Sequence, residues 1–144
     1  MTVLGLALFT VLLAGAGELL LAPLALVAFA FGAVLWVLDI ALYLSVTVWL
    51  AKKSTEGAAI PPLYIAITEW RETLLRLFTV LALLSIAAFG WAILRTGLLP
   101  SWIGWISIIW SLFWLVHLFI TKTTIPIVHH VMPLVIGIAL LVEG

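Results

Sequence analysis

Residues 29–49 read FAFGAVLWVLDIALYLSVTVW, an apolar run crossed by one line of polar and aromatic positions. That line consists of Gly32, Trp36, Asp39, Tyr43 and Thr47. At about 100° per residue these positions fall within about 80° on one face of a helix. Asp39 lies near the midpoint of this helix, and because a carboxylate is costly in hydrocarbon, we expect its face to be turned towards protein or a wet cavity.

The composition of the whole chain argues against a water-soluble domain. Its 144 residues are 67% hydrophobic and 8% charged, which leaves too little polar surface to cover a folded exterior. The length suits about five membrane-spanning helices of about 20 residues each. A formal charge of zero argues against nucleic-acid binding, and the lack of cysteine excludes disulfides and thiolate chemistry.

Turn signals divide the chain into five apolar segments. We predict membrane helices at residues 2–20, 23–51, 63–95, 101–120 and 126–141. The expected fold is therefore an all-α transmembrane bundle that forms one domain over residues 1–144. A bundle of four spans, in which the first run is re-entrant or merges with the second, is the alternative. The third helix would extend about 50 Å, so its first turns, including Arg71 and Glu72, are expected in the interface or in water.

Charged and aromatic residues indicate the orientation of these spans. One side receives most of the basic residues: Lys52, Lys53, Arg71, Arg76 and Lys122. Arg95 falls on the other side, so the positive-inside tendency predicts a cytoplasmic N-terminus. Aromatic belts are expected at the outer interface, with Trp91, Trp102 and Trp105, and at the inner interface, with Trp49 and Trp70.

The fourth span has a polar line of its own. It consists of Gly104, Ser107, Trp110, Ser111, Trp114 and His117. Small residues and serine hydroxyls favour close packing and hydrogen bonds between membrane helices, and we prefer that interpretation. The alternative is a slot lined by Trp110 and Trp114 that accepts a flat or apolar ligand.

The fifth span places His129 and His130 on one face with Pro133, which cannot donate a hydrogen bond to the carbonyl of His129. Counting from Lys122 puts both imidazoles and that of His117 about 7–12 Å inside the cytoplasmic boundary. The sequence therefore predicts a buried polar cluster in the inner half that narrows towards Asp39. Its other members are Tyr43, Thr47 and Arg76.

Three interpretations of this cluster compete. His117 could ligate haem b with His129 or His130, as in bis-imidazole sites. Asp39 and the histidines could instead form a proton or solute path, since ionisable residues inside membranes often mark one. The third interpretation, which we prefer, is structural: hydrogen bonds between helices satisfy these groups.

No catalytic motif or metal-ligand set is present, so we expect no enzymatic activity. Glu72 and Arg76 are expected to form an ion pair across one helical turn.

Two late motifs carry a resemblance. Residues 97–105 read GLLPSWIGW, and residues 133–141 read PLVIGIALL. A G-L-L-P-x-W-x-G-W turn and a P-L-x-x-G-x-x-L-L terminal helix resemble those of small bacterial multi-pass membrane proteins of unknown function. The resemblance covers the last third of the chain and, loosely, residues 32–51; it implies a bacterial inner-membrane protein. We expect a non-enzymatic accessory subunit of a membrane complex, or a binder of a small apolar ligand or pigment.

Overall fold

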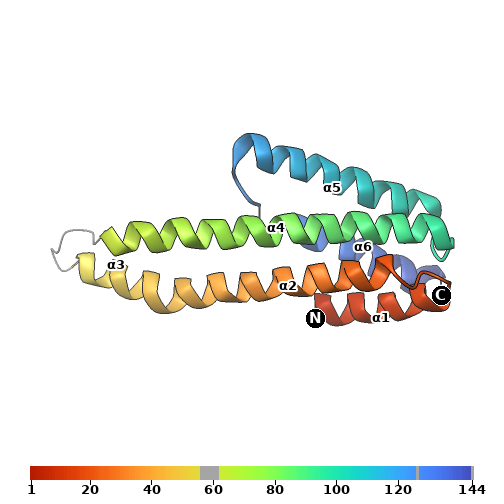
Figure 1. Ribbon diagram of the computed structural model, residues 1–144, viewed down its shortest axis with the longest axis horizontal. Helices are drawn as coiled ribbons and strands as arrows, with labels where there is room; N and C mark the ends of the chain where they lie inside the picture. The colour runs from red at the N-terminus through yellow and green to blue at the C-terminus, as the bar shows by residue number, and fades with distance from the viewer. Residues whose placement is uncertain (56–61, 126, 144) are drawn as a thin grey trace.

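The computed structural model describes residues 1–55, 62–125 and 127–143, and all regular structure within them is helical (Figure 1). The elements are α1 (Thr2–Gly15), α2 (Leu21–Leu42), the π-helical turn η1 (Tyr43–Thr47), α3 (Val48–Thr55), α4 (Pro62–Thr96), α5 (Ser101–Thr121) and α6 (Val128–Glu143). Because α2, η1 and α3 form one continuous rod, the fold is a bundle of five apolar helices. The predicted all-α membrane bundle is confirmed.

Three of the five rods are long and apolar enough to cross a membrane. They are Leu21–Lys53, Pro62–Thr96 and Ser101–Thr121. The first helix is shorter than predicted: α1 ends at Gly15 and its 14 residues extend about 21 Å. The chain turns there because Gly17 adopts φ 100°, a conformation that L side chains rarely take.

The continuous rod of α2, η1 and α3 lies antiparallel to α4 (Figure 1). The two form a long hairpin against which the other helices pack. Gly32 lets the ring of Phe78 approach α2, and Phe29 meets the same ring edge-on at 6.4 Å between centroids. Further along, the hydroxyl of Ser85 donates to the carbonyl of Ala25 at 2.7 Å. These contacts fix the register of the two helices.

Two glycines bring α4 and α5 together. A Cβ atom added to Gly90 would lie 2.7 Å from the carbonyl oxygen of Gly104, and one added to Gly104 would lie equally close to that of Gly90. The packing interpretation of the polar line on α5 is therefore correct at this point. The hydroxyls of Ser107 and Ser111, however, donate to carbonyls of their own helix at 2.8 Å rather than across to α4. These serines act in packing through their small size.

The two ends of the thick part of the bundle are polar. At one end Arg95 Nη1 lies 3.2 Å from Glu18 Oε2, while Glu18 Oε1 accepts the backbone N–H of Leu21 and so caps α2. That hydrogen bond, and then the charge of Arg95, hold the pKa of Glu18 below its usual value, although burial opposes them. At the other end the predicted ion pair between Glu72 and Arg76 is present at 2.9 Å.

The spacing of these ends matches a bilayer. From Arg76 to Arg95, α4 rises about 28 Å, close to the roughly 30 Å of hydrocarbon. The hairpin made of α3, η1 and the first turns of α4 extends beyond the end of α5 (Figure 1). Many of its outward side chains are nevertheless apolar. Those that are exposed include Tyr43, Leu44, Val48, Trp49, Leu63, Ile65 and Trp70.

Candidate functional site

Asp39 is buried, as predicted, but its partner comes from a segment that we expected in the interface or in water. Arg71 Nε lies 2.9 Å from Asp39 Oδ1 and donates to the main-chain carbonyl of Asp39 at 3.4 Å. The guanidinium carbon of Arg71 also lies 4.7 Å from the centre of the Tyr43 ring. The contact between Arg71 Nε and Asp39 Oδ1 is an ion pair by distance, while Oδ1 has no hydrogen bond among the described residues.

The position of Arg71 gives the level of Asp39 along the bundle. Arg71 precedes Arg76 by five residues along α4 and so lies about 7 Å further from Arg95 than Arg76 does. The contact with Arg71 therefore places Asp39 at the base of the projecting hairpin.

Thr47 is also buried, in the π-helical turn just beyond Tyr43. Its hydroxyl lies 3.5 Å from the carbonyl of Leu42, five residues earlier, as the wider π-helical turn allows. This turn was not predicted, because no residue in the stretch departs from an ordinary apolar helix. Thr47 stabilises its own helix and does not extend towards the histidines.

Two of the three histidines belong to a compact cluster of aromatic rings. It consists of Trp36, Phe78, His129 and His130, and we call it the imidazole cluster. The His129 ring lies 4.3 Å from that of Phe78 and 4.4 Å from that of His130, centre to centre. His129 is completely buried, and neither of its ring nitrogens has a hydrogen-bond partner among the described residues. A buried polar group without a partner is costly, which makes this the most unusual polar site in the described helices.

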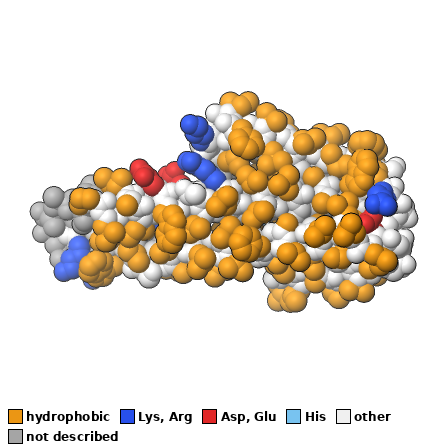
Figure 2. Space-filling view, in the orientation of Figure 1, with side chains coloured by type: hydrophobic (Ala, Val, Ile, Leu, Met, Phe, Trp, Pro, Cys, Tyr) orange, Lys and Arg blue, Asp and Glu red, His pale blue; other side chains and the backbone are white. Residues whose placement is uncertain are grey.

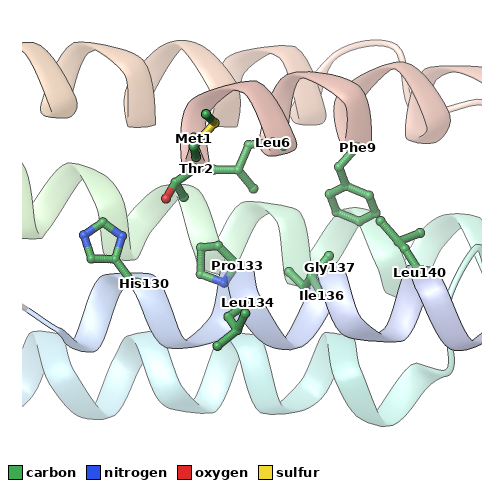
Figure 3. A pocket seen from close by; sticks show the side chains of 11 residues that line it. Met1, Thr2, Leu6, Phe9, His130, Pro133, Leu134, Ile136, Gly137 and Leu140 are labelled. Atoms are coloured by element: carbon green, nitrogen blue, oxygen red, sulfur yellow. The ribbon is translucent and has the colours of Figure 1, made fainter.

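A groove of about 410 Å³ runs between α1 and α6, beginning at the imidazole cluster (Figure 3). Its lining includes Thr2, Leu6 and Phe9 from α1 and His130, Pro133, Leu134, Ile136, Gly137 and Leu140 from α6. His130 lies at one end and Leu140 at the other, and the Thr2 side chain points in from above (Figure 3). The groove reaches the surface at Leu134, which is exposed.

Most of the groove wall is apolar, and its polar groups gather at one end. His130 is only partly buried, so its ring is accessible from the groove. Because Pro133 has no N–H, the carbonyl of His129 lacks its normal helical partner. The structure thus places His129 and His130 in one site, together with α1 residues that the sequence analysis did not include. The spacing of Leu6, Phe9 and Leu13 was the available signal, since it marks a buried face.

The remaining predicted site residues lie on α5. Trp110 Nε1 donates to the carbonyl of Val128 at 3.0 Å, which attaches the start of α6 to α5. The Trp114 ring lies 5.8 Å from that of Trp110 and 5.1 Å from that of His117. His117 Nδ1 is also 3.4 Å from the Thr121 hydroxyl. The rings of the predicted tryptophan slot therefore pack largely against one another.

The predicted single polar cluster is thus divided among separate places. Asp39 and Tyr43 meet Arg71, His129 and His130 meet Trp36 and Phe78, and His117 meets Trp114. These ring contacts do not pair His117 with another imidazole, as bis-imidazole ligation of haem requires. Within the described ranges, no three His, Asp or Glu side chains form a group suited to a metal ion.

Comparisons of the chain with models of known families, with curated proteins and with solved structures find no match.

Proposed function

We propose that this membrane protein binds an elongated apolar molecule with one polar end in the groove between α1 and α6. The proposal rests on the asymmetry of the groove, whose walls are mostly apolar and which has His130 at one end. Ligand sites are typically apolar cavities of about 300–1,000 Å³ with a few well-placed polar groups, and this groove has both features.

The polar end determines the class of ligand. The His130 imidazole can donate or accept a hydrogen bond, and so can the Thr2 hydroxyl. These groups suit a carboxyl, a hydroxyl or a quinone carbonyl. From His130 to Leu140 the helix rises about 15 Å, which accommodates a fatty-acyl or isoprenoid chain. A fatty acid, a long-chain alcohol and a prenylquinone are the members of this class.

The other ligand hypotheses have weaker geometric support. Haem b needs a pair of imidazoles on one slot, and His117 packs with Trp114 instead. A proton or solute path through Asp39 would pass a carboxylate already engaged by Arg71. A pigment held by Trp110 and Trp114 would have to displace contacts between the two rings.

Equilibrium binding of a fluorescent fatty acid to the protein in nanodiscs tests the proposal. Gly137 lines the groove and has no neighbour within 4 Å of an added Cβ, so Gly137→Phe would fill the groove without disturbing the backbone. Gly15→Phe is the matched control, because Gly15 is equally open but outside the groove. We expect G137F to weaken binding at least about tenfold and His130→Ala to weaken it less. Equal affinity in G137F and G15F would contradict the proposal.

A second proposed role, as an accessory subunit, rests on the projecting hairpin. Trp49, Trp70 and their apolar neighbours are exposed beyond the thickness that a bilayer covers. Exposed apolar surface of this kind typically marks an interaction site, and another membrane subunit is the partner that we propose. The basic residues near this hairpin and the two sequence motifs support a place in a bacterial inner membrane, with the hairpin on the cytoplasmic side.

Co-purification in mild detergent tests the second role. Trp49→Ser with Trp70→Ser should release associated subunits, whereas Trp102→Ser, an equally exposed tryptophan at the opposite end, should not. A homogeneous monomer of the unsubstituted protein isolated from native membranes, or subunits that stay bound after the two hairpin substitutions, would contradict it.

A further inference from the structure

A second pocket, of about 420 Å³, lies where α5 ends beside α4. Its polar lining comes from Glu72 and Arg76 on α4 and from Thr121, Lys122, Thr123 and Thr124 after the last turn of α5. Figure 2 shows basic and acidic side chains gathered where the thick part of the molecule meets the projecting hairpin. The pocket is separate from the groove between α1 and α6, since the two share no lining residue.

The pocket carries an excess of positive charge. Arg76 Nη2 and Glu72 Oε2 are 2.9 Å apart, so these two charges offset each other. No ion pair engages Lys122 within the part of the chain that the structure describes. One acid and two bases leave a formal charge of +1, which favours an anion.

Hydrogen-bond donors accompany this charge. Lys122 ends α5 in a left-handed conformation, with φ 57°, and the turn brings the following threonines back towards α4. The Thr121 hydroxyl donates to the carbonyl of His117 and lies 2.8 Å from the Thr123 hydroxyl. The Thr124 hydroxyl makes no hydrogen bond to any other described residue. Arg76, Lys122 and Thr124 can therefore donate to one ligand.

The level of the pocket suggests the source of the anion. Arg76 marks the bilayer boundary on α4, about 28 Å from Arg95. Immediately inside it, α5 presents Val116, Phe119 and Ile120, all exposed and apolar, on which acyl chains can lie. An arginine fork, an ammonium group and hydroxyls together match the several oxygens of a phosphate better than the two of a carboxylate.

We propose that this pocket binds a phosphate group at the membrane surface, as carried by an anionic phospholipid. This site is independent of the ligand groove and does not rest on the function proposed above.

Native mass spectrometry of the purified protein titrated with phosphatidylglycerol tests the site. Lys122→Asn removes the charge while tolerating the left-handed backbone, and we expect it to weaken binding at least about fivefold. Lys122→Arg should retain binding. Lys52→Asn, which removes the same charge on the hairpin and outside the pocket, should change binding less than about twofold.

A second arm identifies the source of the phosphate. If inorganic phosphate displaces phosphatidylglycerol at millimolar concentration, the phosphate group alone is sufficient for binding. If it does not, the lipid chains contribute to binding. Either result supports the site when K122N binds phosphatidylglycerol weakly. Thr124→Val provides an independent variant in case K122N does not fold, and it should also weaken binding. Unchanged phosphatidylglycerol binding in K122N or in T124V, relative to K52N, would overturn the proposal.

Discussion

The close approach of α4 and α5 gives the sharpest stability prediction. In Gly90→Ala the new methyl group would stand 2.7 Å from the carbonyl oxygen of Gly104 and 2.9 Å from Cβ of Ser107. Both distances are shorter than folded proteins accommodate, and the nearest atom is backbone, which cannot rotate away. The two helices must therefore separate by several tenths of an ångström. Overpacking of this kind typically costs about 1–3 kcal/mol.

Gly104→Ala approaches the same contact from the other helix and should behave alike, because its methyl group would meet the carbonyl oxygen of Gly90 at 2.7 Å. Gly137→Ala is the matched control: nothing lies within 4 Å of its added Cβ. Removing a glycine from an open helical position is neutral or stabilising by up to about 1 kcal/mol. The free energy of unfolding of G90A and of G104A should thus fall at least about 1 kcal/mol below that of G137A.

Unfolding with a denaturing detergent in mixed micelles, followed by tryptophan fluorescence, measures these differences. Unfolding of G90A and G104A at the same detergent fraction as G137A would contradict this prediction. That result would mean that α5 does not rest on α4 through these glycines, and the phosphate pocket at the end of α5 would lose its support as well.

Three further predictions concern the polar contacts. Asp39→Asn should lower the free energy of unfolding by about 1.5–3 kcal/mol, because it leaves Arg71 without its charged partner. A double-mutant cycle with Arg71→Gln should show coupling between the two residues, and additive effects would argue against the pair. Ser85→Ala should cost about 0.6 kcal/mol, the average for a hydrogen bond between membrane helices, and a gain in stability would show that the bond is not made. The pKa of Glu18 is lower in the folded chain than in the unfolded chain, where it lies near 4.5. The contribution of Glu18 to stability is therefore complete above pH 4.5 and disappears as the pH falls through the pKa of the folded state. The thermal midpoint should therefore drop at acidic pH, and Glu18→Gln should flatten that dependence; an unchanged pH profile in E18Q would refute this.

The sequence was sufficient to predict the helices and most of their ends. The predicted helix at 63–95 ends as α4 at Thr96, where Gly97 follows with φ 64°, and the one predicted at 101–120 begins as α5 at Ser101, directly after Pro100. Hydrophobic length and turn residues are local properties, so they can be read without knowing the packing. The end of the first helix was misplaced because residues 19–22 are as apolar as the helix before them.

The grouping of the polar residues was harder to predict. Which side chains meet depends on the register between helices, and Gly32 against Phe78 and Ser85 against Ala25 fix that register only in three dimensions. The register places Asp39 beside Arg71, a residue that the length of its helix had assigned to the interface or to water. The role of α1 was missed because the spacing of Leu6, Phe9 and Leu13 marks a buried face but does not show which helix lies against it.

Photolabelling can locate a ligand in the proposed groove between α1 and α6. A diazirine fatty acid would be bound to the protein in nanodiscs, crosslinked, and mapped by mass spectrometry. We expect labels on both walls of the groove, at Leu6 or Phe9 and at Ile136 or Leu140, and their loss in G137F but not in G15F. Labels confined to the outward side chains of α1, such as Leu4 and Leu8, or labels that persist in G137F, would contradict the proposal.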